Sequence, residues 1–395
     1  MSSERLKSSD MVIPLHVPHM GGREWDYVRE CLDTNWVSSV GAFVDKFESV
    51  VGEKTGRAHS VATMNGTAAL HTALMVAGIG ENDEVLMPAL TFVASANAVR
   101  YTGAWPVFLD VDPETWQLDP KKVQQFIETE CQVRSGKITN RQSGRQIRAI
   151  MPVHILGHPA DMDPLMELAD SFNLIVIEDA AEALGALYKG RPAGSHGQMA
   201  CLSFNGNKIV TSGGGGALVT DNPEWAARAR HLTTQAKSHP VEYEHDEVGY
   251  NYRLTNIQAA LGCAQLEILE EFVEKKRAIA EAYRAALENI PGITPMHEAP
   301  WARSTYWMYT IVVDEMQYGM NSRVLLQHLA DHRIMSRPLW QPMNLNVAHQ
   351  KAHSAPCPVS EMLHRKCLSI PCSVGLTDDQ QARVIDALRV GRSSS

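Results

Sequence analysis

Several patterns that assign proteins to common functional classes are missing from this chain of 395 residues. No apolar run approaches the roughly 20 residues that span a bilayer, and residues 1–15 contain charges but no long apolar stretch. Neither a membrane anchor nor a secretory signal peptide is therefore predicted. The net charge is −9 and no basic stripe is present, so nucleic-acid binding is not predicted either.

Cysteine pairs and the familiar nucleotide-binding motifs are also missing. The seven cysteines are dispersed without a CxxC pair, which indicates reduced thiols and a cytoplasmic protein. Without GxxxxGKS/T or GxGxxG, P-loop nucleotide hydrolysis and Rossmann dinucleotide binding lose support. His154 and His158 lie four residues apart on an expected strand and turn, which is poor geometry for metal ligands, so no metal is predicted.

The composition is that of an ordinary globular protein, 44% hydrophobic and 21% charged, with enough residues for two domains. From about residue 60, short apolar runs alternate with amphipathic segments. This alternation is typical of an α/β fold with a mostly parallel, doubly wound sheet. The expected strands cover residues 84–88, 106–111, 149–156, 174–178, 199–204 and 216–220. The expected helices cover residues 67–77, 94–102, 119–130, 162–172 and 223–234.

The pattern changes after residue 256. Residues 257–289 carry apolar residues at three- and four-residue spacing, which predicts one long helix that Pro291 and Gly292 end. Beyond residue 292, the sequence contains both strand-like and helix-like patterns. It predicts a strand at residues 307–313 and helices at residues 322–331 and 377–390.

Two domains are therefore predicted. A large domain covers residues 13–256, and a smaller C-terminal α+β domain covers residues 257–391, with the long helix at residues 257–289 linking them. Residues 131–148 are polar and basic, which indicates a surface insertion or hairpin within the large domain.

The segment NGTAALHTALMVAGIG, residues 65–80, is a candidate phosphate site. Gly66 allows a tight turn, and Thr67 offers a hydroxyl at the start of a helix. The N-terminus of a helix presents unpaired N–H groups and a partial positive charge, so anions bind there. An ordinary capped helix would carry the same pattern.

The segment LIVIEDAAEALG, residues 174–185, is a buried strand that ends in two acids. Glu178 and Asp179 are expected to point to opposite sides of the sheet, so that one of them faces a ligand at the carboxyl end of the strand. Ala180 and Ala181 leave room there for a flat group. Asp179 as a simple helix cap is the alternative.

A single lysine, Lys208, precedes the four glycines Gly213 to Gly216 and a further apolar run. The glycines let the chain pass close to the lysine loop and turn into a strand. An amine, a strand-end carboxylate and a phosphate seat are together what pyridoxal phosphate requires. The amine forms a Schiff base, the carboxylate holds the proton of the pyridine nitrogen, and N–H and hydroxyl groups bind the phosphate.

These segments resemble a known family, in which the same motifs occur in the same order. The resemblance extends from Ile13 to the C-terminus and rests on NGTAAL, PALTFVASANAV, DVDPETWQLD, PVHILGHPADMD, IEDAAEALG, SFNGNK with GGGGA, and GYNYRLTNIQAALG. They look like the DegT/DnrJ/EryC1/StrS sugar aminotransferases. The resemblance implies the fold-type I aminotransferase architecture, pyridoxal 5′-phosphate as cofactor, and pyridoxamine phosphate as its alternate form during the reaction.

The resemblance also implies a role for each matching residue. Lys208 matches the Schiff-base lysine and Asp179 the acid on the pyridine nitrogen. By the same match, Glu182 reaches the phenolic oxygen of the cofactor or the substrate, and Asn251 crosses to the phosphate of a neighbouring subunit. A homodimer with shared active sites is therefore expected. The remaining implied cofactor contacts are the phosphate ligands Gly66, Thr67 and Ser203, with Phe92 and Ala181 on the two faces of the ring.

Within the family, the front segment and the lysine loop look like the LegC subgroup. That likeness implies transfer of an amino group from L-glutamate to the C4 ketone of a UDP-2-acetamido-4-keto-2,4,6-trideoxyhexose, on routes to legionaminic acid or bacillosamine-type sugars. The residues expected near the sugar are Trp36, Ser38, Ser39, His154, Arg337 and Trp340.

Three alternatives remain open at this point. The same chemistry on another sugar would use a C3 ketone, or a GDP or dTDP carrier. A related dehydratase would need histidine where this chain has Lys208, which disfavours it. The third alternative is a regulatory protein that binds pyridoxal phosphate without catalysis.

Overall fold

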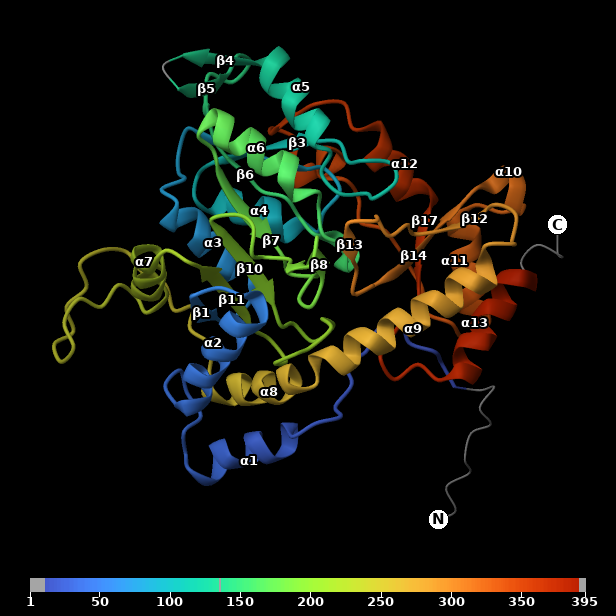
Figure 1. Cartoon of the computed structure of the whole chain (residues 1–395), viewed down its shortest axis with the longest axis horizontal. Coiled ribbons are helices and arrows are strands. Elements are labelled where there is room, and N and C mark those ends of the chain that lie inside the picture. Colours follow the sequence, from blue (N-terminus) through green and yellow to red (C-terminus); the bar gives the residue numbers. More distant parts are fainter. Residues whose placement is uncertain (1–10, 135, 391–395) are drawn as a thin grey trace.

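The computed structural model describes residues 11–134 and 136–390, and its larger half is built on one mixed sheet (Figure 1). Neighbouring strands follow the order β1-β11-β10-β7-β6-β2-β3-β16, and every pair from β10 to β16 is parallel. The strands are β1 (His59–Thr63), β2 (Asp83–Pro88), β3 (Trp105–Leu109), β6 (Gln146–Ile150), β7 (Ile175–Asp179), β10 (Met199–Ser203), β11 (Gly216–Thr220) and β16 (His353–Ser354). The predicted α/β class is confirmed.

Helices cover both faces of this sheet. Along β2, Val85 and Met87 pack into one apolar cluster while Leu86 packs into another, as the alternation of side chains on a strand requires. The first cluster includes residues of α3 and α4, and the second includes residues of α5 and α6. The helices of this half are α1 (Glu24–Asp33), α2 (Ala42–Thr55), α3 (Gly66–Val76), α4 (Val93–Tyr101), α5 (Pro120–Glu130), α6 (Met162–Phe172) and α7 (Pro223–Thr233).

A second, antiparallel sheet of four strands forms the centre of the C-terminal half, in the order β12-β14-β17-β15. Its strands are β12 (Ile293–Pro295), β14 (Tyr309–Val313), β15 (Arg337–Pro338) and β17 (Cys367–Ile370). The helices are α8 (Asn256–Glu267), α9 (Leu269–Leu287), α10 (Glu315–Tyr318), α11 (Ser322–Asp331), α12 (Pro358–Lys366) and α13 (Asp378–Val390). Short strands β8 (Leu187–Tyr188), β9 (Arg191–Pro192) and β13 (Ala302–Arg303) pair with one another.

The two halves are tied together at both ends of the chain. Near the start, Ile13 forms a parallel bridge with Ile334, and near the end, β16 adds an edge to the large sheet. The division at residues 256 and 257 remains a prediction, and its stated end, residue 391, lies outside the described residues.

The sequence expectations differ from the structure at several points, of which three concern long elements. The strand expected at residues 149–156 is β6, which begins at Gln146 and ends at Ile150, and the chain then turns through Leu156 at φ 60°. The helix expected at residues 257–289 is two helices, because Ile268 leaves helical geometry at φ −112° and ψ 12°. Helices α1 and α2 were not expected.

The polar stretch at residues 131–148 is a surface hairpin, as expected, formed by β4 (Cys131–Arg134) and β5 (Lys137–Asn140). All seven cysteines are buried and none forms a disulfide. Within the described part of the chain, no helix has the length and apolarity needed to cross a membrane.

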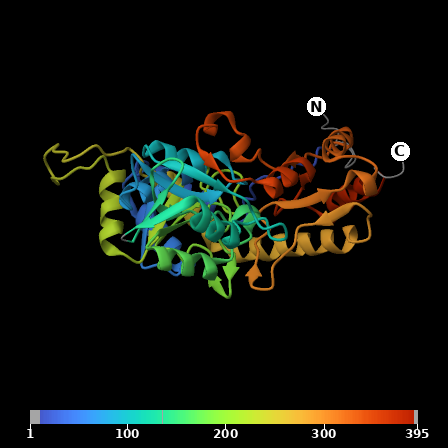
Figure 2. The ribbon, with the colours of Figure 1, turned by 90° about the horizontal axis from the view of Figure 1, so that it is seen from above.

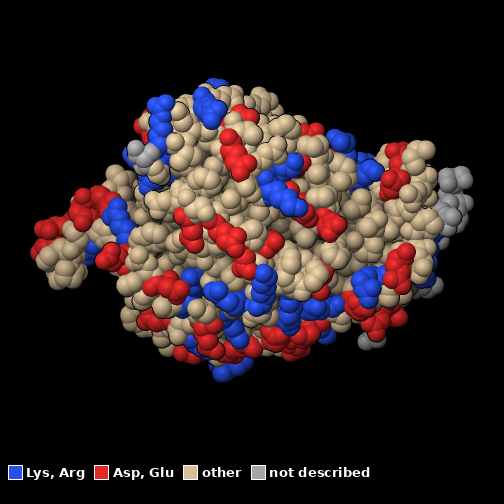
Figure 3. Space-filling view, turned by 45° about the horizontal axis from the view of Figure 1, so that its top comes forward, with Lys and Arg blue, Asp and Glu red and all other residues tan. Residues whose placement is uncertain are grey.

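A narrow arm projects from the body between α7 and α8 (Figures 1 and 2). It lies within residues 237–248, and its exposed apolar side chains include Val241, Tyr243 and Val248. Figure 3 shows acidic side chains on this projection and charges of both signs interspersed over the rest of that face.

Candidate active site

One cavity of about 320 Å³ lies where strands β7 and β10 end and helices α3 and α4 begin. Ligands of open α/β sheets bind at this edge, because the carboxyl ends of the parallel strands meet there. Residues far apart in the sequence therefore share one wall. The predicted residues that line the cavity are Gly66, Thr67, Phe92, Asp179, Ala181, Glu182, Ser203, Lys208 and Trp340.

Asp179 ends strand β7 with its carboxylate held in place from two sides. The Ser95 hydroxyl donates to Oδ2 at 2.6 Å, and the Ala181 backbone N–H donates to Oδ1 at 3.1 Å. Burial raises the pKa of Asp179, and the bonds from Ser95 and Ala181 and the charge of Lys208 act in the opposite direction. Each oxygen keeps a lone pair for a further donor, which suits a carboxylate that holds the proton of a ring nitrogen.

Glu178, the neighbouring acid, points to the opposite side of β7, away from the cavity. It accepts hydrogen bonds from His154 Nε2 at 2.9 Å and from the backbone N–H groups of Gly194, His196 and Gly197 at 2.7 to 2.8 Å. Burial raises its pKa, but the bonds from His154 and the backbone outweigh this effect and lower the pKa to about 2. The expected division of the two acids between the two faces is confirmed.

His154 was expected to line the pocket, and the structure corrects this. Its ring is fully buried behind the strand end, where Nδ1 accepts from the Ala160 backbone N–H at 2.9 Å. The proton therefore sits on Nε2, which donates to Glu178. Its backbone N–H donates to the Asp179 carbonyl at 3.0 Å, so His154 fixes the end of β7.

Helix α3 begins at the cavity wall with two free backbone donors. Asn65 caps the helix by accepting from the Ala68 N–H at 2.8 Å. The N–H groups of Gly66 and Thr67 have no acceptor in the described part of the chain, so they are available to an anion. A Cβ on Gly66 would lie 2.9 Å from the Cβ of Ser203, whose hydroxyl group is part of the same wall.

The glycine run after Lys208 supports this anion seat from behind. Gly213 adopts φ 77°, a left-handed conformation that favours glycine. A Cβ on Gly216 would collide with the Asn65 carbonyl group and lie 2.7 Å from the Gly66 nitrogen. The close approach of β11 to the start of α3 therefore requires glycine at this position.

Lys208 extends into the cavity between a carboxylate and an aromatic face. Its Nζ lies 3.4 Å from Glu182 Oε1 and 4.1 Å from the centre of the Trp307 ring. The second oxygen of Glu182 accepts from the Leu156 N–H at 2.8 Å. Burial raises the pKa of Glu182, while Lys208 and the Leu156 bond oppose the shift. Glu182 therefore contacts the lysine directly, which no sequence motif indicated.

Among the cavity residues that the sequence analysis did not name, Ser95 contacts Asp179 and Trp307 contacts Lys208. Ser95 lies in the segment PALTFVASANAV, but its contact with Asp179 spans 84 residues of sequence. Trp307 comes from the C-terminal half, where its Nε1 donates to the Asn207 carbonyl at 2.6 Å and so fixes the ring beside the lysine loop. Trp307 lies in the strand expected at residues 307–313, and nothing else in the sequence marked it as a site residue.

Besides His154, five predicted residues lie outside this cavity: Trp36, Ser38, Ser39, Arg337 and Asn251. Trp36 is exposed and borders a separate hollow near Gly41 and Asn256, and the Ser38 carbonyl accepts from the Asn256 N–H. Arg337 and Asn251 are also exposed. Their roles as sugar or partner contacts stay predictions.

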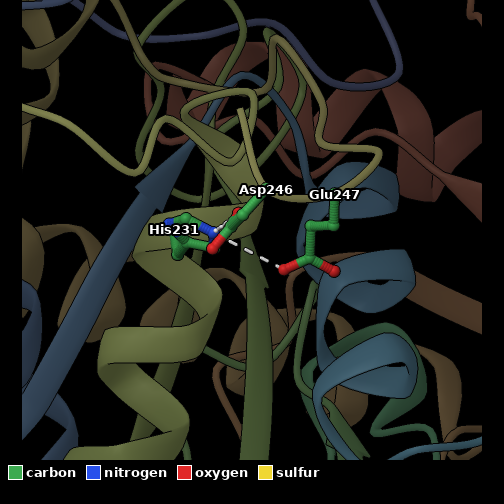
Figure 4. Close-up of side chains that lie close together, drawn as sticks. All are labelled: His231, Asp246 and Glu247. Atoms are coloured by element: carbon green, nitrogen blue, oxygen red, sulfur yellow. Dashed lines mark hydrogen bonds and ion pairs between the residues drawn. The ribbon is translucent and has the colours of Figure 1, made fainter. Parts of the chain in front are cut away.

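One group of side chains has spacing that would suit a metal ion, at the root of the arm (Figure 4). His231 Nε2 lies 2.7 Å from Asp246 Oδ1 and 3.5 Å from Glu247 Oε1. Arg228 already binds both oxygens of Glu247. The cluster is therefore satisfied as an ion-pair network, and no metal is assigned to it.

The chemistry of the cavity fits pyridoxal phosphate. The amine, the supported acid and the free N–H groups are the three anchors that this cofactor requires, and Phe92 and Ala181 add apolar surface for its ring. A family model described as the DegT/DnrJ/EryC1/StrS aminotransferase family matches residues 18–389. The chain belongs to this family.

Individual relatives agree with that assignment. The chain is 40% identical to the GDP-perosamine synthase of Caulobacter vibrioides, and the match covers 95% of this chain and 97% of the relative. It is 38% identical to EpsN of Bacillus subtilis, whose name describes a pyridoxal phosphate-dependent aminotransferase, over 95% of both chains. The solved structure of DesI with its TDP-sugar product aligns with a TM-score of 0.87 at 31% identity, covering 98% of this chain and 94% of DesI. The protein is a pyridoxal phosphate-dependent sugar aminotransferase.

The first prediction concerns the glycine behind the anion seat. In Gly216→Ala, the added methyl group displaces the peptide that joins Asn65 to Gly66, so we expect cofactor affinity to fall about tenfold. Titration of the apoenzyme with pyridoxal phosphate measures this. Gly80→Ala is the control, because the nearest atom to its Cβ is a carbonyl oxygen at 3.8 Å. Equal dissociation constants for both variants would contradict the proposed packing role of Gly216.

The second prediction concerns the buried acid Glu178. Because its pKa is lower in the folded chain than the ordinary 4.5, it stabilises the fold above pH 4.5, and this contribution is lost as pH falls towards 2. Glu178→Gln should lower the free energy of unfolding at pH 7 by about 3 kcal/mol. Denaturant unfolding from pH 7 to pH 3, with exposed Glu128→Gln as control, should show the deficit shrinking as pH falls. If Glu178→Gln lowers the free energy of unfolding equally at every pH, the stabilising role of the charged Glu178 carboxylate is disproved.

Proposed function

We propose that the enzyme transfers the amino group of L-glutamate to the C4 ketone of a nucleotide-linked 4-keto-6-deoxyhexose. The observation that carries this proposal is the convergence of Lys208, Asp179 and the start of α3 on one cavity. Members of this family act on sugars, and the space beside Lys208 is bordered by Trp307 and Trp340, whose aromatic faces suit a pyranose ring.

The proposal also concerns which nucleotide carries the acceptor sugar. Two relatives, from Caulobacter vibrioides and Escherichia coli O157:H7, are GDP-perosamine synthases at 40% and 39% identity, which supports a GDP-linked acceptor. The likeness of the front segment to the LegC subgroup supports a UDP-2-acetamido sugar instead. We give the GDP-linked acceptor precedence, because those identities extend over nearly the whole chain.

Three residues of the cavity have defined tasks in this proposed reaction. Bound pyridoxal phosphate supplies the carbonyl group that takes up the amino group and the ring that takes up an electron pair. Lys208 Nζ removes the α-proton of glutamate and, in the second half-reaction, delivers a proton to C4 of the sugar. Asp179 holds the proton of the ring nitrogen, and Glu182, 3.4 Å from Lys208 Nζ, orients the amine when it is charged.

The third prediction tests the chemistry and the carrier together. The purified enzyme should show a visible cofactor absorption band that L-glutamate bleaches and that a 4-keto-6-deoxyhexose linked to GDP restores. Lys208→Ala and Lys208→Arg should lose turnover, since neither side chain provides a free basic amine at neutral pH.

The acceptor assay has informative alternatives. If only the UDP-2-acetamido sugar restores the absorption band, the acceptor is UDP-linked and not GDP-linked. If only a 3-keto sugar restores it, the amino group is transferred to C3 and not to C4. Continued multiple turnover by Lys208→Ala would overturn the mechanism. A band that glutamate leaves unchanged would overturn the proposed donor.

We further propose that the enzyme is a homodimer in which Asn251 of each copy reaches the phosphate bound by the other. Asn251 is exposed and lies outside the cavity of its own chain, yet it matches the family position that contacts phosphate. A two-fold dimer would bring two such residues to two sites at once.

The fourth prediction tests this sharing by hybrid formation. Lys208→Ala, inactive alone, and Asn251→Ala, weak alone at limiting cofactor, should form heterodimers on co-expression with different tags. One site in each heterodimer then combines a native Lys208 with a native Asn251 from the other copy. Statistical mixing should restore about a quarter of wild-type activity. An activity equal to the average of the two parents would rule out the shared site.

A further inference from the structure

The backbone that carries Asn251 is held firmly on both sides. The Tyr250 N–H donates to the Leu232 carbonyl at 2.7 Å, and the Tyr252 carbonyl accepts from the Met64 N–H at 2.7 Å. Asn251 itself pairs with Thr234 in an antiparallel bridge, which marks extended backbone. Successive side chains of an extended segment point to opposite sides, so Asn251 points away from both of its tyrosine neighbours.

Those two tyrosines form an aromatic platform on helix α3. The rings of Tyr250 and Tyr252 are stacked, with centres 4.9 Å apart and planes at 19°. The ring of His71 meets both edge-on, at 4.9 Å and 5.9 Å, and its Nδ1 lies 3.2 Å from the Tyr252 hydroxyl. Rings in this arrangement restrict one another, because stacked and edge-to-face contacts have preferred geometries.

His71 is buried and remains only partly satisfied. Its side chain is nearly inaccessible, and Nε2 has no hydrogen-bond partner in the described part of the chain. Burial lowers the pKa of His71, and burial with the nearby phenols raises the pKa of Tyr252, so both groups are neutral at physiological pH. A buried polar ring with one unpaired nitrogen destabilises the fold, and a role in positioning Asn251 would explain why a histidine is present here.

We propose that His71 is a positioning residue that aims Asn251 at the cofactor phosphate of a second copy of this chain. This inference rests on the shared site proposed above. Helix α3 then serves both sites of the dimer: its first N–H groups face the phosphate of its own chain, and its His71 supports the residue that serves the other. The connection between them runs along six residues of one helix, from Gly66 to His71.

The fifth prediction follows from the choice of ligand. Pyridoxal phosphate and pyridoxal differ only in the phosphate that Asn251 would contact. His71→Leu should weaken pyridoxal phosphate binding to the apoenzyme about tenfold while leaving pyridoxal binding unchanged, the loss expected for one hydrogen bond to a charged group. Asn251→Ala should do the same, and the double variant should lose no more than Asn251→Ala alone.

Two further variants make the result decisive. Tyr252→Phe removes only the hydroxyl group near His71 and should cause a smaller loss in the same direction, which settles the matter if His71→Leu does not fold. Tyr101→Phe is the control, since Tyr101 touches the same ring at 5.7 Å but has no bond to residues 250–252.

The outcomes separate the two proposals. If Asn251→Ala weakens phosphate-dependent binding while His71→Leu and Tyr252→Phe do not, the positioning role is overturned and the shared site stands. If Asn251→Ala itself has no effect, the shared site fails first. Equal losses for pyridoxal and pyridoxal phosphate would show that His71 has a general structural role, which also overturns the inference.

Discussion

The active site depends on how the end of strand β7 is fixed. Two adjacent acids lie there, and only their placement on opposite faces of the sheet keeps them apart. Glu178 is saturated by His154 and three backbone N–H groups, so it remains charged and anchors the strand from behind. Asp179 can then face the cavity with its oxygens oriented by Ser95 and Ala181. The position of Asp179 thus depends in part on hydrogen bonds that Glu178 makes outside the cavity.

The sequence was sufficient to predict the placement of those site residues that local patterns mark. Lys208, Asp179 and Gly66 each stand at the end of an apolar run, where alternation of strands and helices places them at one edge of the sheet. Strand β11 was predicted to the residue at 216–220, because the glycines precede its apolar run and Asp221, Asn222 and Pro223 follow it. Lys208, Asp179 and Gly66 converge on a single cavity because the parallel strands end at the same edge of the sheet. The alternation of strands and helices in the sequence also indicated such a sheet.

Features that depend on packing between distant segments were not predictable. The apolar spacing of residues 257–289 continues without a break, so nothing local marks Ile268 as the point where α8, packed on α1 and α2, gives way to α9. Trp307 reaches Lys208 only because the C-terminal half folds back onto the lysine loop. His154 was misjudged because its partner, Glu178, lies on the hidden face of a strand.

The residues that line the cavity come from two separate parts of the sequence. Apart from Trp307 and Trp340, the side chains that line it belong to residues 65–208. The groups that would hold the cofactor and the aromatic rings proposed to face the sugar are thus encoded in separate stretches of the gene. Substitutions at Trp307 and Trp340 would therefore change the wall that faces the sugar in the proposed reaction and leave unchanged the residues that would hold the cofactor.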